Sequence, residues 1–251
     1  MSRRYATIFC LMTTFLIPSF AKAQNNPCNP CSKKGVIFQV KDPMGRNSVT
    51  FKSAAPLEDI TGTSSQITGY ISFDPDKPDM GGHGKLTVPV ATLKTGIPMR
   101  DEHLLGAEWL DAGKFPNISL DIKSVKTIKE TKSTSTSITY DVTIEGDFSL
   151  HGMTKSLTIP GRITYLQENE QTKMMMEGNL LAARANFNIA LKDFGVPSPE
   201  REMLIGSRVG GDITLDISFI GTTAMAMAAN PCNPCGEKAM NPCNPCSSNK
   251  K

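Results

Sequence analysis

The sequence predicts an all-β domain of about eight antiparallel strands with one short helix, and three observations lead to this prediction. Between about Gly35 and Gly221, apolar residues recur at every second position, which is the period of a strand with one buried face. Turn signals such as DPDKPD at 74–79 separate these runs. No stretch is long enough to supply the crossover helices of a parallel sheet. Strands of this number stack as a sandwich or close as a barrel, and alternation alone does not choose between them.

The strands follow from the alternation in chain order. The runs with inward-facing alternate residues are Ile67 to Phe73, Leu86 to Val90, Ile118 to Ile122, Ile138 to Ile144, Phe187 to Leu191 and Ile213 to Phe219. Residues 100–113 (RDEHLLGAEWLDAG) break the alternation, so we expect a short helix or compact loop with Leu104, Leu105, Trp109 and Leu110 turned inward. Residues 129–137 (KETKSTSTS) are polar and predict an enlarged hairpin tip.

The first residues have the features of an export signal. Arg3 and Arg4 precede an apolar run at 6–20, and residues 21–23 (AKA) fit the small-x-small pattern of a cleavage site. We therefore expect residues 1–23 to be a signal peptide and the protein to be periplasmic or secreted. The apolar run is too short for a permanent span, which predicts no stable membrane anchor. The rest of the chain divides into an N-terminal tail at 24–34, one domain at 35–221 and a C-terminal tail at 222–251.

The charge of the chain argues against one class of partner. Removal of residues 1–23 takes away three of the 27 basic residues and no acidic residue, which leaves 24 basic against 24 acidic side chains. The formal charge then falls from +3 to zero. A neutral chain without a block of Lys or Arg lacks the basic surface that nucleic acid attracts. We therefore expect no nucleic-acid partner.

The hexapeptide NPCNPC occurs at 26–31, 230–235 and 241–246, and both tails that carry it are expected to be disordered. Each Cys-Asn-Pro-Cys pair could close a local disulfide or act as an exposed redox couple. The thiolates could instead bind Cu(I) or Zn(II). We favour oxidised or redox-active cysteines over a metal site. The cysteines concerned are Cys28, Cys31, Cys232, Cys235, Cys243 and Cys246.

The sequence contains no recognisable catalytic motif. It lacks the G-x-S-x-G elbow, the P-loop, the dinucleotide fingerprint and H-E-x-x-H. The three histidines, His83, His103 and His151, lie 20 and 48 residues apart, which fits no local metal-binding spacing. We therefore expect a binding protein and not an enzyme.

Several segments, in this order, resemble the YceI-like polyisoprenoid-binding family. The most specific are RDEHLLGAEWLDAGKFPNISL at 100–120 and YDVTIEGDFSLHGMTKSLTIPG at 140–161. They are accompanied by GYISFDP at 69–75, VPVATLKTG at 88–96, LKDFGVPSP at 191–199 and VGGDITLDISF at 209–219. The resemblance implies an extended, exported, lipocalin-like antiparallel β-barrel. Such a barrel would hold an isoprenoid lipid, either a polyisoprenoid or a quinone tail, in its apolar interior without catalysis.

The candidate ligand contacts combine this resemblance with the residue pattern. We expect Arg100 and His103 to bind a polar head group at the mouth of the barrel, with Asp101 paired to the arginine. The alternative is a structural role in which Asp101 caps the short helix. The other expected ligand contacts are Ile71, Phe73, Leu86, Val88, Trp109, Phe148 and His151.

A second function remains open from the sequence. The alternative is a periplasmic soft-metal or thiol-redox protein that uses the three CNPC motifs and has the barrel as a scaffold. For the lipid binder, the expected partner is the isoprenoid lipid or quinone itself. A membrane complex that accepts the lipid and a second copy of the chain, forming a homodimer, are further candidate partners.

Overall fold

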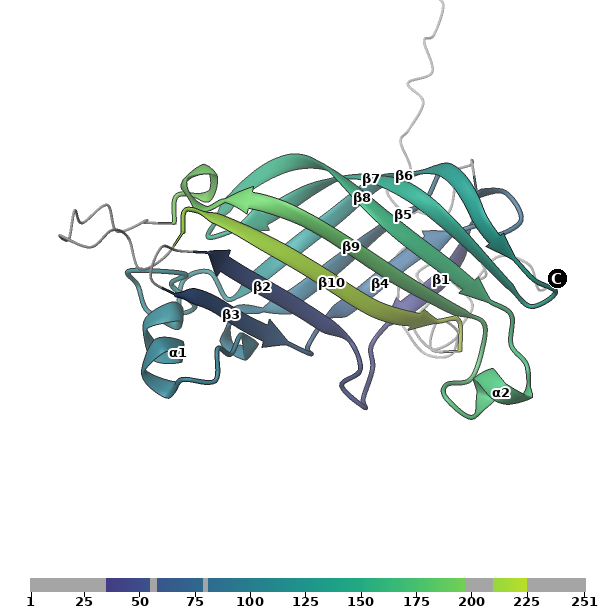
Figure 1. The fold of residues 1–251 in the computed structure, drawn as a ribbon, viewed down its shortest axis with the longest axis horizontal. Coiled ribbons are helices and arrows are strands. Elements are labelled where there is room, and N and C mark those ends of the chain that lie inside the picture. Colours follow the sequence, from purple (N-terminus) through teal and green to yellow (C-terminus); the bar gives the residue numbers. More distant parts are fainter. Residues whose placement is uncertain (1–34, 55–57, 79–80, 197–209, 225–251) are drawn as a thin grey trace, which may run out of the picture.

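The fold was analysed in a computed structural model that describes residues 35–54, 58–78, 81–196 and 210–224. The described residues form ten strands, with α1 and α2 at opposite ends of the molecule (Figure 1). The strands are β1 (Val36–Val40), β2 (Ser48–Ala54), β3 (Asp59–Ser64), β4 (Thr68–Phe73), β5 (His83–Pro89), β6 (Asn117–Ser133), β7 (Ser137–Leu150), β8 (Met153–Leu166), β9 (Leu180–Ala190) and β10 (Asp212–Thr222). The helices are η3 (Val90–Thr92), α1 (Pro98–Leu105), α2 (Glu170–Lys173) and η4 (Leu191–Phe194).

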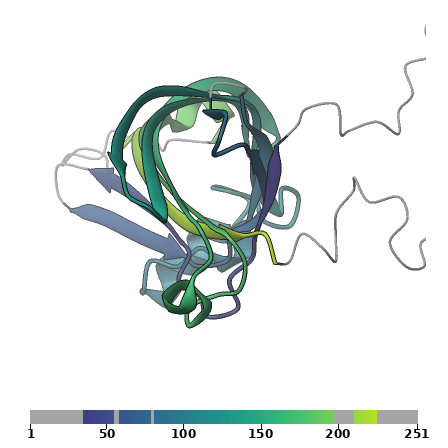
Figure 2. The same ribbon diagram turned by 90° about the vertical axis from the view of Figure 1, so that its right-hand side faces the viewer.

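Eight strands close into an antiparallel barrel in the order β1-β4-β5-β6-β7-β8-β9-β10. β10 returns to β1 through the pair Gln39↔Thr222, and the view from the α2 end shows the resulting ring (Figure 2). Closure provides backbone hydrogen-bond partners for the strands that would otherwise form exposed edges. The prediction of an antiparallel barrel of about eight strands is therefore confirmed.

The β2–β3 hairpin completes the wall near α1. β2 pairs with the first half of β10, from Ile213↔Ser53 to Ser218↔Ser48. β3 then forms a bridge to the chain after β5: the Thr63 amide donates to the Lys94 carbonyl at 2.8 Å, and the Lys94 amide donates to Thr63 at 2.9 Å. The wall is thus closed by β1 at the α2 end and by the β2–β3 hairpin at the α1 end.

Apolar and polar side chains alternate along the strands, so that the apolar side chains point into the barrel and the polar ones point to solvent. On β7, Tyr140, Val142, Ile144, Phe148 and Leu150 are buried, as the period of two requires. The intervening polar residues face outward and form cross-strand ion pairs: Arg162 with Asp141 at 2.8 Å, Lys126 with Glu145 at 2.5 Å and Lys123 with Asp147 at 3.6 Å. Each exposed pair contributes only about 0 to 1 kcal/mol, so the apolar interior dominates the stability.

β6 departs from strict alternation. Its pairing with β7 shifts between Ile122 and Ser124, and the next inward-facing residue is Val125, three positions after Ile122. A bulge inserts one residue into one strand and resets which side chains face inward. Two further shifts carry β6 to Ser133, so that the expected hairpin tip at 129–137 is reduced to the three residues between β6 and β7.

The break in alternation at 100–113 corresponds to α1 and the turns that follow it. The helix begins two residues earlier than the segment, at Pro98, a residue favoured at the first position because it has no amide hydrogen to satisfy. Leu110 is buried, and Leu104, Leu105 and Trp109 pack against the core. The prediction that these four side chains turn inward is confirmed.

We predict that Gly69→Ala destabilises the barrel strongly. Gly69 lies in β4 with a φ of 141°, and a Cβ at this position would stand 1.9 Å from the Lys85 carbonyl oxygen on β5. Strained dihedral angles and a backbone clash together should cost more than about 2 kcal/mol of unfolding free energy. Urea denaturation followed by circular dichroism measures this loss.

Gly211→Ala is the matched control. A Cβ at Gly211 has no atom within 4 Å, so this substitution should change the unfolding free energy by no more than about 0.5 kcal/mol. Equal urea midpoints for the two variants would contradict the role assigned to Gly69.

Candidate functional site

An apolar cavity occupies the interior of the barrel. Its volume is about 120 Å³, and it is partly open to solvent. All of its lining residues except Ser119 carry aliphatic or aromatic side chains. Residues from the strands include Val49 and Phe51 of β2, Leu86 and Val88 of β5, Leu120 of β6, Phe148 and Leu150 of β7, Ile189 of β9 and Leu215 of β10. Such a lining favours an apolar ligand and offers no charge to an ionic one.

A second, much smaller space lies beside the first. Its volume is about 20 Å³, about the room of one water molecule, and it is lined by residues such as Ile71, Ile144 and Phe219, with Arg162 and Arg184 also at its wall. Leu86, Leu120 and Ile217 line both spaces. These three side chains therefore lie between the two spaces of one barrel interior.

One aromatic side chain of the main cavity, Phe148, is packed against two further rings. Phe148 of β7 meets Phe187 of β9 and Phe194 of η4 edge to face, with ring centroids 6.0 and 5.5 Å apart. Edge-to-face contacts of this kind add about 0.5 to 1.5 kcal/mol to the burial of each ring. The Phe148 ring is therefore held in a fixed position at the cavity wall.

The α1 segment supplies the lining at one end of the cavity. Leu104, Trp109 and Leu110 all face the cavity. The start of the segment is fixed by Asp101, which accepts hydrogen bonds from the Thr95 amide and the Thr95 hydroxyl, each at 2.7 Å. Asp101 thus ties α1 to the loop that also forms the bridge with β3.

The same hydrogen bonds set the protonation of Asp101. The Thr95 amide, then the Thr95 hydroxyl and the charge of Lys94 hold the pKa of this carboxyl below its ordinary value. Asp101 is therefore ionised at neutral pH. Its charge serves the loop contact and does not face the cavity lining.

The comparisons with known proteins agree with this architecture. The sequence model of the YceI-like domain matches residues 42–220 of the chain. The chain belongs to the YceI-like family. A UPF0312 protein of Pseudomonas fluorescens is 31% identical over 165 residues, which cover 66% of this chain and 75% of that protein. A UPF0312 protein of Pseudomonas savastanoi pv. phaseolicola is 31% identical over 164 residues, covering 64% and 73%.

Two solved structures share the fold of this YceI-like chain. BcnA of Burkholderia cenocepacia is 17% identical and superposes with a TM-score of 0.54 over 73% of this chain and 99% of that one. A polyisoprenoid binding domain from Saccharophagus degradans, implicated in plant cell wall breakdown, is 9% identical with a TM-score of 0.52 over 75% and 99%. At these identities the likeness concerns the fold.

The structure places the predicted ligand contacts in three groups. Four of them, Leu86, Val88, Trp109 and Phe148, line the main cavity of the YceI-like barrel. Ile71 lines the second, smaller space. Phe73 is fully buried and packs edge to face against Tyr140, with centroids 6.0 Å apart, and it lines neither space.

The predicted polar contacts lie outside the lining. Arg100 pairs with Glu58, with Nη2 3.0 Å from Oε1, so the expected pairing with Asp101 is replaced by a partner 42 residues away. His103 is exposed on α1. His151 occupies the tight turn between β7 and β8 with a φ of 50°, and its ring packs against Phe115 at 4.6 Å.

Several lining residues were not among the predicted contacts. They include Val49, Phe51, Ile67, Leu93, Val196, Ile213 and Leu215. The period of two marks Ile67, Ile213 and Leu215 as inward-facing, and this signal could have selected them. Val49 and Phe51 also alternate with the polar Thr50 and Lys52, so the same signal could have selected them. Leu93 carries no such signal, because its placement depends on the bridge that closes the wall.

The predictions on the cysteine motifs, a metal site and a membrane span are separate from the cavity. The six cysteines of the CNPC motifs lie outside the described residues. Within the described part of the chain, no group of three His, Cys, Asp or Glu side chains is placed to hold a metal ion. No helix there is long and apolar enough to cross a membrane.

We predict that Asp101→Asn destabilises the protein more at neutral pH than in acid. Because folding lowers the pKa of Asp101, its contribution is complete above the ordinary value of about 3.9 and is lost as the pH falls through the lowered pKa. The difference in urea midpoint between wild type and variant should therefore shrink between pH 7 and pH 3. The half-exposed Asp121 provides the control variant Asp121→Asn. An unchanged difference at pH 3 would contradict the assignment.

Proposed function

We propose that this YceI-like barrel binds an isoprenoid-type lipid, a polyisoprenoid or the tail of a quinone, in its interior and catalyses no reaction. The observation that carries the proposal is the lining of the main cavity, which is aliphatic or aromatic at every position except Ser119. A branched hydrocarbon chain can fill such a space without leaving a polar group unpaired. The polyisoprenoid binding domain of Saccharophagus degradans, which has the same fold, supports this class of ligand.

The shape of the barrel favours a long ligand over a compact one. β7 and β8 each contain 14 residues, which at about 3.3 Å per residue corresponds to strands of about 46 Å. Leu86, Leu120 and Ile217 lie between the two spaces, so a ligand that extends from one into the other must displace these side chains. A thin, flexible isoprenoid chain matches the length of the strands and needs the least displacement.

We further propose that the protein acts after export, as a carrier. The leader-like residues 1–23 support delivery to the periplasm or outside the cell. A carrier of a water-insoluble chain needs a donor and an acceptor, and a membrane complex is the acceptor that we propose. A homodimer stays a prediction from the sequence.

The cavity can be blocked at Leu86, which lines both spaces. Leu86→Trp replaces an aliphatic side chain by a bulky indole ring inside the barrel, while Lys85→Trp puts the same ring on the outer face of β5. We predict that Leu86→Trp abolishes or weakens binding of a short polyprenol by at least about tenfold and that Lys85→Trp leaves binding unchanged. Fluorescence titration measures both, and circular dichroism verifies that both variants fold.

Equal affinities for the two tryptophan variants would contradict binding in the interior. A Leu86→Trp variant that no longer folds would be replaced by Val88→Phe, a smaller increase in volume at the main cavity. The same comparison with Lys85→Trp then applies.

Arg100 is the proposed contact for a polar head group. It lies four residues before the cavity-lining Leu104, so both side chains are on the same face of α1. Its pair with Glu58 is exposed and contributes about 0 to 1 kcal/mol, so Arg100→Ala should remain folded. We predict that this variant binds an isoprenoid quinone several-fold more weakly and binds the corresponding hydrocarbon as wild type does. Unchanged affinity for the quinone would remove Arg100 from the site.

A further inference from the structure

Three side chains inside the barrel border both the main cavity and the small space beside it. They are Leu86 of β5, Leu120 of β6 and Ile217 of β10, and together they are called the inner gate below. Their order along the strands shows that they lie between the two spaces. On β10, Leu215 lines only the main cavity, Ile217 lines both spaces and Phe219 lines only the small one.

The same order recurs on β6. Ile118 lines only the main cavity, Leu120 lines both spaces and Ile122 lines only the small one. Both strands run from the α1 end of the barrel toward the α2 end (Figure 1). The small space therefore lies beyond the inner gate, on the side of α2.

The side chains of the inner gate have small neighbours. Leu86 and Leu120 are direct partners across the β5–β6 pair, so their side chains stand next to each other on the inner face. A Cβ added at Gly146 of β7 would lie 3.3 Å from Leu120 Cδ1, and Ile217 pairs with Ala185 of β9. Truncation of Leu120 would therefore open room beside a glycine that has no side chain to fill it.

The main cavity is much shorter than the strands around it. A dry cavity of about 150 Å³ holds one benzene ring, so the 120 Å³ of the main cavity has room for about one isoprene unit before any side chain moves. β7 and β8 contain 14 residues each and extend far beyond such a unit. A longer chain can use this length only by moving the inner gate.

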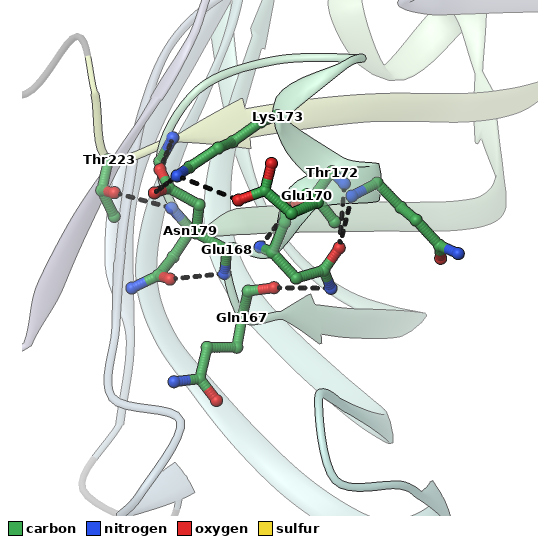
Figure 3. A network of polar contacts seen from close by, with 10 residues as sticks. Gln167, Glu168, Glu170, Thr172, Lys173, Asn179 and Thr223 are labelled. Carbon is green, nitrogen blue, oxygen red and sulfur yellow. Dashed lines mark hydrogen bonds and ion pairs between the residues drawn. The ribbon is translucent and has the colours of Figure 1, made fainter.

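The wall beyond the inner gate is held together by hydrogen bonds. β9 pairs with β10 over the full 11 residues of both strands. Past this ladder, the Asn179 amide donates to the Thr223 hydroxyl at 3.0 Å and the Thr223 amide donates to the Asn179 carbonyl at 3.1 Å (Figure 3). The Glu168 amide donates to the Asn179 side chain at 2.9 Å. Spreading the strands would break these bonds, so we expect the gate side chains to move instead.

We propose that the inner gate sets the length of the isoprenoid chain that the barrel accepts. A chain gains affinity with each carbon that it buries up to the gate, whereas further burial requires displacement of packed side chains. The strands supply the length of the interior, and the gate determines how much of it a ligand can use. This inference rests on the proposed function and adds selection by chain length to it.

The test compares geraniol with geranylgeraniol, an isoprenoid alcohol with the same head group and a longer chain. Trp109 is the only tryptophan of the chain and lines the main cavity, so its fluorescence reports the binding of both alcohols. Leu120→Ala should raise the preference for geranylgeraniol over geraniol by at least about tenfold relative to wild type, because it opens the gate to the longer chain. Circular dichroism verifies that the variant folds.

Leu150→Ala is the matched control, because Leu150 loses the same atoms but lines only the main cavity. Its preference between the two alcohols should stay within about threefold of that of wild type, since the added room serves both chains alike. A Leu120→Ala variant that does not fold would be replaced by Ile217→Ala. Its control is Ile213→Ala, on the same strand but lining only the main cavity.

The outcomes separate this inference from the proposed function. Binding of both alcohols with equal preference in Leu120→Ala and Leu150→Ala would overturn the role of the inner gate and leave the proposed function standing. A wild-type chain that binds neither alcohol would overturn the proposed function, and this inference with it.

Discussion

Closure of the sheet into a ring is the constraint on which the rest of this structure depends. Pairing of β10 with β1 at one end, and the bridge between Thr63 and Lys94 at the other, give the edge strands their hydrogen-bond partners. A closed wall forces every second side chain into one interior, and the side chains present do not fill it. The apolar cavity is thus a consequence of closure combined with inward-facing side chains that leave space near α1.

The segment around α1 connects this closure to the candidate site. Asp101 holds the loop at Thr95, the adjacent Lys94 holds β3, and Leu104 faces the cavity on the next turn of the helix. The main role of the charged residue Asp101 is therefore to hold α1 in place. The ligand contact that we propose for Arg100 depends on this position of the helix.

Regular strands could be predicted from the sequence. The bulge in β6 and the ion-pair partner of Arg100 could not, because both depend on residues far away in the chain. The alternation of β7 identified Tyr140, Val142 and Ile144 as buried, because burial on a regular strand follows from position alone. The bulge after Ile122 and the partner of Arg100 left no local signal, since both depend on the strand or loop that lies opposite. The residue types predicted that the interior of the barrel is apolar. The volume of the cavity could not be predicted, because it depends on how the ring of strands closes.

Occupancy of the barrel interior by an isoprenoid lipid can be measured on the native protein. Native mass spectrometry of the protein purified from its own cells without detergent, with identification of any released lipid, should find about one isoprenoid chain per molecule. A barrel that carries no lipid, or one that carries only unbranched fatty acyl chains, would contradict this occupancy.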